Sequence, residues 1–316
     1  MLAQHARVFS GAAPLTADVN TRRLGDYHGY AELVQRWCEL ERAGARVERI
    51  GTSAAGEPLF CVDLGPADAA RASVVMAGIH PMEWIGVESG LALLERLVAA
   101  PPPDRRIVAF PLVNVDGYRQ VERDLRAGHW RFVRTNTRGV DLNRNWRVHF
   151  RKRRRLAGVL FGWNYGGPQP TSEPEIEAVV GKLDDVAATA TIDAAVSLHS
   201  FGRMILVPYG GTLARAPRYA ELARAAEAVQ RRLRFRYRIG QSSRWVPGVK
   251  VCGMELDHLH DEYGAIALLI ECSRGGARLR DPASWLHPFR WYNPPRPRDE
   301  AGAIADALVP FVNPPG

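Results

Sequence analysis

Short apolar runs alternate along the chain with longer segments of helical periodicity. Four of these runs occupy residues 73–79 (SVVMAGI), 106–113 (RIVAFPLV), 194–200 (AAVSLHS) and 265–271 (AIALLIE). A run of this length with few polar residues is typical of a strand that is buried on both faces of a sheet. We therefore predict that these segments form interior strands of one sheet.

Helical segments lie between and around the predicted strands. Apolar residues recur at helical spacing over residues 28–44, 83–99, 172–187, 216–234 and 298–312. Ser172 and Glu175 match the Ser-x-x-Glu capping box, which predicts the start of the third helix. Residues 45–51 and 58–65 are predicted to form two further strands joined by a turn. This alternation predicts an α/β fold in which helices flank a mixed central sheet.

Length and composition indicate one globular domain. The chain has 316 residues, of which 46% are hydrophobic and 24% charged, as is ordinary for a folded protein. We predict an N-terminal arm over residues 1–26 and a single domain over residues 27–316. The sequence contains neither an apolar stretch long enough to span a membrane nor a recognisable signal peptide, so we expect a cytoplasmic protein.

The chain is basic, with a formal net charge of +8. Its densest basic cluster is RVHFRKRRR, residues 147–155. Such a cluster could bind nucleic acid, but no recognition motif accompanies it, and a basic patch alone gives only non-specific affinity. We favour a solvated loop edge and expect neither a nucleic-acid nor a membrane partner.

Candidate chemistry begins where the first apolar run ends. The segment AGIHPMEW, residues 77–84, places His80 just after a predicted strand and Glu83 at the start of a predicted helix. Zinc accepts nitrogen and oxygen ligands of this kind, and a catalytic site needs three of them. Alone, His-x-x-Glu is a weak signal, and a structural histidine beside a helix-capping glutamate explains it equally well. His199, in VSLHSFG, is a candidate third ligand.

The predicted topology brings these residues together. His80, His199 and Glu271 each stand at the carboxyl end of a predicted apolar strand. Open α/β sheets form their sites in the crevice at those ends. We therefore expect the three side chains to meet.

Several motifs occur in an order that resembles the zinc carboxypeptidase family, which includes the digestive metallocarboxypeptidases. They are VNVDGY (113–118), RTNTRGVDLNRNW (134–146), YGGPQPTSEPE (165–175), SLHSFGRMILVPYG (197–210) and LIEC (269–272). The resemblance runs from about Tyr27 to Glu271 and implies a phosphorylase/hydrolase-like α/β/α sandwich. It also implies that residues 27–316 form the catalytic domain of a zinc metallocarboxypeptidase.

The resemblance assigns a role to each candidate. His80, Glu83 and His199 are implied to bind one zinc ion per chain. Glu271 is implied to be the general base that takes a proton from zinc-bound water. The reaction would remove one residue from a peptide or peptide-like substrate that has a free C-terminal carboxylate.

Four further residues are implied to bind the substrate or stabilise charge. Asn143 and Arg144 match the pair that holds the substrate carboxylate, a task that suits the planar guanidinium of arginine. Arg134 best fits the spacing of the arginine that polarises the scissile carbonyl, and Arg131 is the competing candidate. Asp141 either orients a metal-binding histidine or forms a turn.

The sequence departs from the digestive enzymes near the substrate. Met82 stands where they have an arginine, and Val249 where they have a mobile tyrosine. Leu256 matches the residue that lines their side-chain pocket and suggests an apolar pocket, whereas Glu255 beside it could attract a basic side chain. Only about 26 residues precede the resemblance, so we expect no activation segment of the digestive kind.

Other functions are kept as alternatives. One is an N-acyl-amino-acid deacylase of the aspartoacylase type, which shares the three zinc ligands and the Asn-Arg pair, here Asn143 and Arg144, that we call the carboxylate clamp. Another is a non-catalytic binding protein with this fold, although such proteins normally lose a zinc ligand or the base.

In VNVDGY we predict a structural turn in which Gly117 adopts a positive φ.

Overall fold

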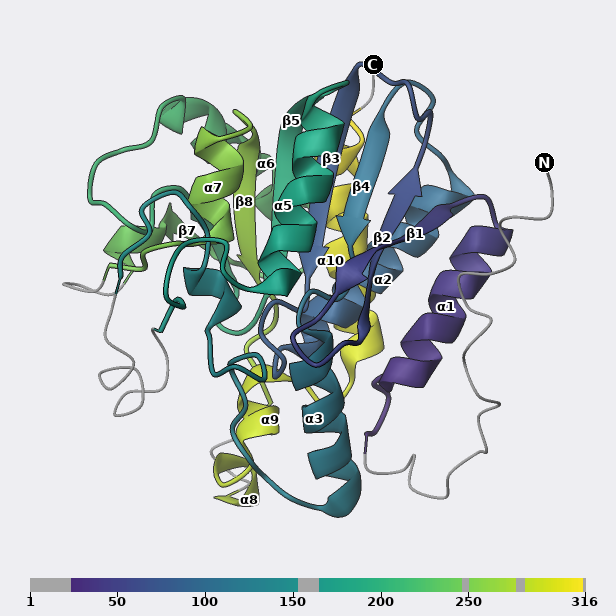
Figure 1. The fold of residues 1–316 in the computed structure, drawn as a ribbon, viewed down its shortest axis with the longest axis vertical. Helices are drawn as coiled ribbons and strands as arrows, with labels where there is room; N and C mark the ends of the chain where they lie inside the picture. The colour runs from purple at the N-terminus through teal and green to yellow at the C-terminus, as the bar shows by residue number, and fades with distance from the viewer. Residues whose placement is uncertain (1–23, 153–164, 246–249, 277–281, 315–316) are drawn as a thin grey trace.

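The computed structural model describes residues 24–152, 165–245, 250–276 and 282–314 (Figure 1). The predicted arm, residues 1–26, lies almost wholly outside this part, as do Val249 and the end of the basic cluster. The described residues form a sheet of eight strands with helices on both faces, as the sequence predicts.

The sheet is mixed, and its centre is parallel. The strand order is β1-β2-β4-β3-β5-β8-β6-β7. The strands are β1 (Arg46–Thr52), β2 (Pro58–Leu64), β3 (Arg71–Ala77), β4 (Arg106–Phe110), β5 (Thr191–His199), β6 (Met204–Val207), β7 (Arg238–Gln241) and β8 (Ile266–Glu271). Strands β4, β3, β5 and β8 are neighbours and run parallel, whereas β2 and β6 join them antiparallel. These four parallel strands are the four apolar runs of the sequence.

Helices cover both faces of the sheet. Those longer than one turn are α1 (Tyr30–Arg42), α2 (Trp84–Ala99), α3 (Val115–Ala127), α5 (Pro174–Ala187), α6 (Tyr219–Arg232), α7 (Glu255–Asp261), α9 (Pro288–Tyr292) and α10 (Pro297–Val312), and α8 is the single turn Pro282–Trp285. Figure 1 shows α5 and α7 in front of the sheet and α2 and α10 behind it. The carboxyl ends of the parallel strands point toward α3 and α9 (Figure 1).

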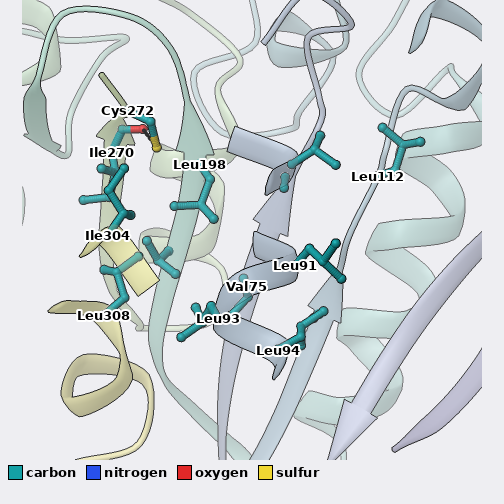
Figure 2. Close-up of a cluster of buried hydrophobic side chains, with 14 of the residues drawn as sticks. Val75, Leu91, Leu93, Leu94, Leu112, Leu198, Ile270, Cys272, Ile304 and Leu308 are labelled. Carbon is teal, nitrogen blue, oxygen red and sulfur yellow. Dashed lines mark hydrogen bonds between the residues drawn. The ribbon is translucent and has the colours of Figure 1, made fainter. Parts of the chain in front are cut away.

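Alternation along the strands produces two hydrophobic cores. In β3, Val75 and Ala77 face the core that contains α2 and α10, whereas Val74 and Met76 face the core that contains α5 and α7. Figure 2 shows the first of these cores, where leucines of α2 and the Ile304 side chain of α10 surround the strand residues. A strand that is buried on both faces needs apolar residues at every position, which explains the continuous runs.

Two local predictions are wrong. The helix α5 begins at Pro174, and its N-cap is Glu173 without a side-chain cap, so Ser172 forms no capping box. Gly117 lies inside α3 rather than in a turn with positive φ. Its lack of a side chain serves packing instead, because a Cβ there would lie 2.7 Å from Pro81. The sequence also did not predict the strands β6 and β7 or the helices α3, α7, α8 and α9.

None of the helices in the described ranges is both long and apolar enough to cross a lipid bilayer.

One buried histidine should make stability depend on pH. His258 is fully buried between the rings of Trp146 and Tyr263, and burial lowers its pKa from 6.5 to about 4. The unfolded chain therefore binds this proton first as pH falls, so stability is lost between pH 6.5 and 4. We expect His258→Phe to reduce the loss of unfolding free energy between pH 7 and pH 4 by about 2–3 kcal/mol. Urea unfolding at both pH values measures this, with exposed His129→Phe as the control; equal pH dependence in the two variants would contradict it.

Candidate active site

Two histidines and a glutamate converge at the carboxyl ends of the parallel strands. Nδ1 of His80 lies 2.9 Å from Oε1 of Glu83, and Nδ1 of His199 lies 2.9 Å from Oε2 of the same carboxylate. The two imidazole Nδ1 atoms are 3.2 Å apart. All three side chains are buried, and one donor atom from each lies within 4.8 Å of the others.

The strands place these side chains as the sequence predicts. His199 is the last residue of β5, and in the parallel register it is paired with Glu271, the last residue of β8. His80 follows β3, and Glu83 is the N-cap residue of α2. The carboxylate of Glu83 also accepts a hydrogen bond from the backbone N–H of Ser200, at 3.1 Å. Three segments that are distant in the chain therefore meet at one edge of the sheet.

The donor set of His80, Glu83 and His199 suits a divalent cation. Two nitrogens bound to a tetrahedral zinc at about 2.0–2.1 Å lie about 3.3 Å apart, close to the separation of the two Nδ1 atoms. Burial acts to raise the pKa of Glu83, but the two histidines together hold it well below the usual range of a carboxyl group. Glu83 is therefore an anion at neutral pH and can bind a metal ion.

Asp141 connects the metal-site histidine to two other groups. Its Oδ1 lies 3.2 Å from Nε2 of His80 and accepts a hydrogen bond from the backbone N–H of Asn143 at 3.0 Å. Its Oδ2 accepts from Nε of Arg134 at 2.9 Å. Burial opposes ionisation, but Arg134, Arg144 and His80 keep the pKa of Asp141 well below its usual value. The two placements that the sequence left open are therefore both present: Asp141 lies against a histidine and caps the turn Leu142–Arg144.

Asn143 and Arg144 lie in the 3-10 turn Leu142–Arg144, which Asp141 caps. Gly253 packs against this turn with φ +69, and a Cβ there would lie 2.5 Å from the carbonyl oxygen of Arg144. Only glycine permits both this conformation and this close approach. The turn is therefore held from two sides, and both side chains line the cavity beside the histidines.

Glu271 and Arg134 complete the polar part of this cavity. Burial, followed by the Glu83 carboxylate, raises the pKa of Glu271 to about 8, while His199 and Arg134 act in the opposite direction. A divalent cation bound by the two histidines and Glu83 would lower this pKa. Arg134 is held charged beside Asp141, and its Nη1 lies 3.9 Å from Oε1 of Glu83.

The cavity has a volume of about 260 Å³, and most of its other lining residues are apolar. Six of them, which we call the apolar wall, are Met204, Leu206, Trp245, Val251, Met254 and Leu269, and Ser200 and Ser242 also line the cavity. Tyr292 and Phe201 lie at the same cavity, with their rings in edge-to-face contact. One cavity therefore combines a candidate metal site, two arginines and an apolar recess.

Two of the predicted site residues do not reach the cavity. Arg131 forms an ion pair with Asp124 and lines a separate surface hollow at residues 128–131. This leaves Arg134 as the arginine beside the candidate metal ligands. Leu256 is 1% exposed and packs in the hydrophobic core that contains α5 and α7, while Met254 lines the cavity. The sequence could not resolve this because the register of the loop before α7 is set by contacts with distant residues.

Three residues at the site could not be predicted from the sequence. Tyr292, Trp245 and Met254 line the cavity, but none of them belongs to a motif or follows an apolar strand. Glu255, which the sequence suggests as an attractor of a basic side chain, instead lies against His199. Only the folding of separate loops over the strand ends brings them there.

An open α/β sheet with two histidines and a carboxylate at its strand ends has the architecture of a metal-dependent hydrolase. The family model described as zinc carboxypeptidase matches residues 38–278, and the chain belongs to this family. Carboxypeptidase A6 of Mus musculus is 31% identical over 250 residues, which are 71% of this chain and 56% of that protein. Mast cell carboxypeptidase A of the same species is 28% identical over 74% of this chain and 61% of that protein. The chain thus spans a little over half the length of these curated relatives.

Solved structures share the fold at lower identity. Bovine thrombin-activatable fibrinolysis inhibitor, in complex with tick carboxypeptidase inhibitor, aligns with a TM-score of 0.71 and 23% identity over 90% of this chain and 96% of that chain. Carboxypeptidase A from Helicoverpa armigera aligns with a TM-score of 0.67 and 20% identity over 90% and 74% of the two chains. These likenesses confirm the predicted fold class.

Proposed function

We propose that the protein is a zinc metallocarboxypeptidase that removes the C-terminal residue of a peptide or peptide-like substrate. The observation that carries this proposal is that His80, Glu83, His199 and Glu271 line one cavity together with Asn143 and Arg144. Family membership supports the same reaction. One zinc ion per chain would be held by the two Nδ1 atoms and the Glu83 carboxylate.

The substrate's terminal carboxylate is bound by the 3-10 turn. The guanidinium of Arg144 and the side-chain amide of Asn143 line the cavity. The Oδ1 atom of Asn143 already accepts a hydrogen bond from the backbone N–H of Glu255, at 3.2 Å, so its NH₂ group can donate to a carboxylate. Binding at this point aligns the last peptide bond with the strand ends.

Glu271 then acts on the attacking water. A zinc ion bound at the site supplies Lewis-acid activation, which lowers the pKa of water and polarises a carbonyl group. The Glu271 carboxylate accepts the proton of the water as it attacks the scissile carbonyl carbon, and it later returns that proton to the leaving amine. Arg134 lines the same cavity and offsets the negative charge that develops on the carbonyl oxygen.

The carboxylate clamp provides the test of this function. We expect Arg144→Ala to raise KM for free-acid peptides about 100-fold, because a charge-assisted pair is worth about 1.5–3 kcal/mol. Steady-state rates on acid and amide forms of one peptide, and on N-acyl amino acids, measure this. Wild type should hydrolyse the acid form far better than the amide and lose activity with a chelator. Equal rates on acid and amide, or turnover of N-acyl amino acids alone, would refute the proposal.

The apolar wall sets the expected side-chain preference. Glu83 and Glu271 line the cavity but are assigned to the zinc ion and to the attacking water. Two other carboxylates, both on α7, are engaged elsewhere: Glu255 contacts His199, and Asp257 accepts hydrogen bonds from the backbone N–H groups of Gly210 and Gly211. Neither lines the cavity. Among the described residues that form the apolar wall, none carries a charge, so an ammonium or guanidinium group there would be desolvated without a partner from that wall.

We therefore expect substrates with a C-terminal leucine or phenylalanine to be preferred over lysine or arginine. The expected ratio of kcat/KM is about 100-fold or more, because the desolvation of an unpaired charge costs several kcal/mol. A library of peptides that differ only in the last residue measures it. A preference for lysine or arginine would show that the recess does not hold the substrate side chain as proposed.

A further inference from the structure

Glu255 lies directly behind the metal-site histidine. It is the first residue of α7 and is fully buried, and its Oε1 lies 2.7 Å from Nε2 of His199. We propose that Glu255 is a positioning residue that holds the His199 imidazole in the orientation and tautomer required for metal binding. This inference rests on the proposed function, because it assumes that His199 binds zinc.

The two nitrogens of His199 face opposite surroundings. Nδ1 faces His80 and Glu83, whereas Nε2 faces Glu255 and the hydroxyl of Ser197, which lies 3.0 Å away. A neutral imidazole carries one proton. A carboxylate can only accept a hydrogen bond, so Glu255 draws that proton to Nε2 and leaves the Nδ1 lone pair directed at the metal site. The Ser197 hydroxyl can donate or accept and could not enforce this choice alone.

The arrangement parallels that of the other histidine. Nε2 of His80 faces Asp141 just as Nε2 of His199 faces Glu255, so a carboxylate stands behind each imidazole. Asp141 also binds Arg134 and the backbone of Asn143, and its replacement would disturb three groups. Within the described residues, the Glu255 side chain has a hydrogen-bonding contact with His199 alone, and its Oε2 is buried without a partner.

The burial of Glu255 argues against a side chain without a function, because a buried carboxylate destabilises the fold unless it is paired. A fully buried carboxylate is retained at low cost only when a positive charge or strong donor lies beside it. The imidazole of His199 is that donor, and a cation on its far side would polarise the Nε2–H bond further. Carboxylate partners of this kind typically change metal affinity 10- to 100-fold.

The backbone of Glu255 has a separate task. Its N–H donates to Oδ1 of Asn143, so one residue contacts both a metal ligand and the carboxylate clamp. Side-chain substitution leaves this backbone hydrogen bond in place. Loss of the carboxylate should therefore affect the metal site while substrate binding is retained, which separates a positioning role from a general structural one.

The experiment compares Glu255→Gln and Glu255→Asp with the wild type. The matched control is Glu175→Gln, which makes the same change at another fully buried carboxylate, one that contacts Asn136 and the backbone of Ala54. Zinc affinity is measured by competition with a chromogenic chelator, and the site geometry by the visible spectrum of the Co²⁺-substituted protein. We expect Glu255→Gln to bind zinc about 10- to 100-fold more weakly and to alter the Co²⁺ bands. The Glu175→Gln control should stay within about threefold of wild type.

At saturating zinc, KM for a free-acid peptide should remain within about threefold of wild type, while kcat falls. A Glu255→Gln variant with wild-type zinc affinity and an unchanged Co²⁺ spectrum would overturn the inference and leave the proposed function intact. A wild-type protein that binds no zinc or hydrolyses no peptide would instead remove the proposed function. If circular dichroism shows that one variant is unfolded, the other decides; unfolding of both would assign Glu255 to the structural core and overturn the inference.

Discussion

Replacement of Glu271 by glutamine should lower kcat about 10³-fold or more while zinc binding is retained. The reason is that a side-chain amide at this position could not accept the proton of the attacking water, and general base catalysis contributes about 10²–10⁴-fold. Glu271 lies at the end of β8 and lines the same cavity as the candidate metal ligands. Among the described residues, its carboxylate forms no hydrogen bond with the imidazole of His80 or His199. Steady-state kinetics and zinc analysis of the purified variant measure the two effects separately.

The pH profile gives a second measure of the same residue. Glu271 must be ionised to act as a base, so kcat/KM should rise with pH through its pKa. Burial and Glu83 raise this pKa to about 8, and a bound cation would lower it, so the acid limb should lie below pH 8. Glu175→Gln, at a buried carboxylate outside the cavity, should keep both the rate and the acid limb. A Glu271→Gln variant with more than a tenth of wild-type kcat would exclude Glu271 as the base.

Removal of the metal should abolish hydrolysis and lower the melting temperature by roughly 6 °C. His80, Glu83 and His199 place electron-rich donor atoms within 4.8 Å of one another, and a cation that binds only the folded chain stabilises it. The stabilisation is about 4 kcal/mol when free zinc is a thousand times its Kd. An unfolding entropy of about 2.1 cal/mol/K per residue converts this energy into the expected shift.

Calorimetry with zinc and with a chelator measures this shift, and activity after zinc is restored tests reversibility. His199→Ala should lose the response to zinc, whereas His129→Ala, which replaces an exposed histidine, should keep it. A melting temperature and a rate that do not change on chelation would contradict a functional metal site at these residues.

Much of the fold followed from local patterns. The four apolar runs became the parallel centre of the sheet because a strand with helices on both faces requires apolar residues at every position. The strands β6 and β7 have four residues each and could not be predicted, because so short a segment carries little periodicity. The sequence predicts a turn at the start of α3 because Asn114 and Gly117 are common in turns, but in the structure Oδ1 of Asn114 accepts a hydrogen bond from the Gly117 N–H as a helix cap.

The candidate site was predictable to a similar extent. His80, His199 and Glu271 could be named in advance because each stands in a motif at a predicted strand end, and parallel strands place such ends at one edge. Glu83 could be named because it opens the helix that follows His80. Arg134 and Arg131 could not be separated by spacing alone. The choice between them required the tertiary structure, in which Arg134 pairs with Asp141 beside the candidate metal ligands and Arg131 pairs with Asp124 away from them.

The sequence by itself determined the parallel centre of the sheet, the longest helices that flank it and the set of residues that could bind a metal ion, because these depend on periodicity and on the order of motifs. The tertiary structure alone decided that Met254 rather than Leu256 faces the cavity, and that Glu255 lies against His199 instead of lining the recess. Both outcomes depend on the direction in which α7 leaves its loop. Contacts with Asn143 and with the turn that Gly253 supports set that direction, and these residues are far apart in the chain or outside any periodic pattern.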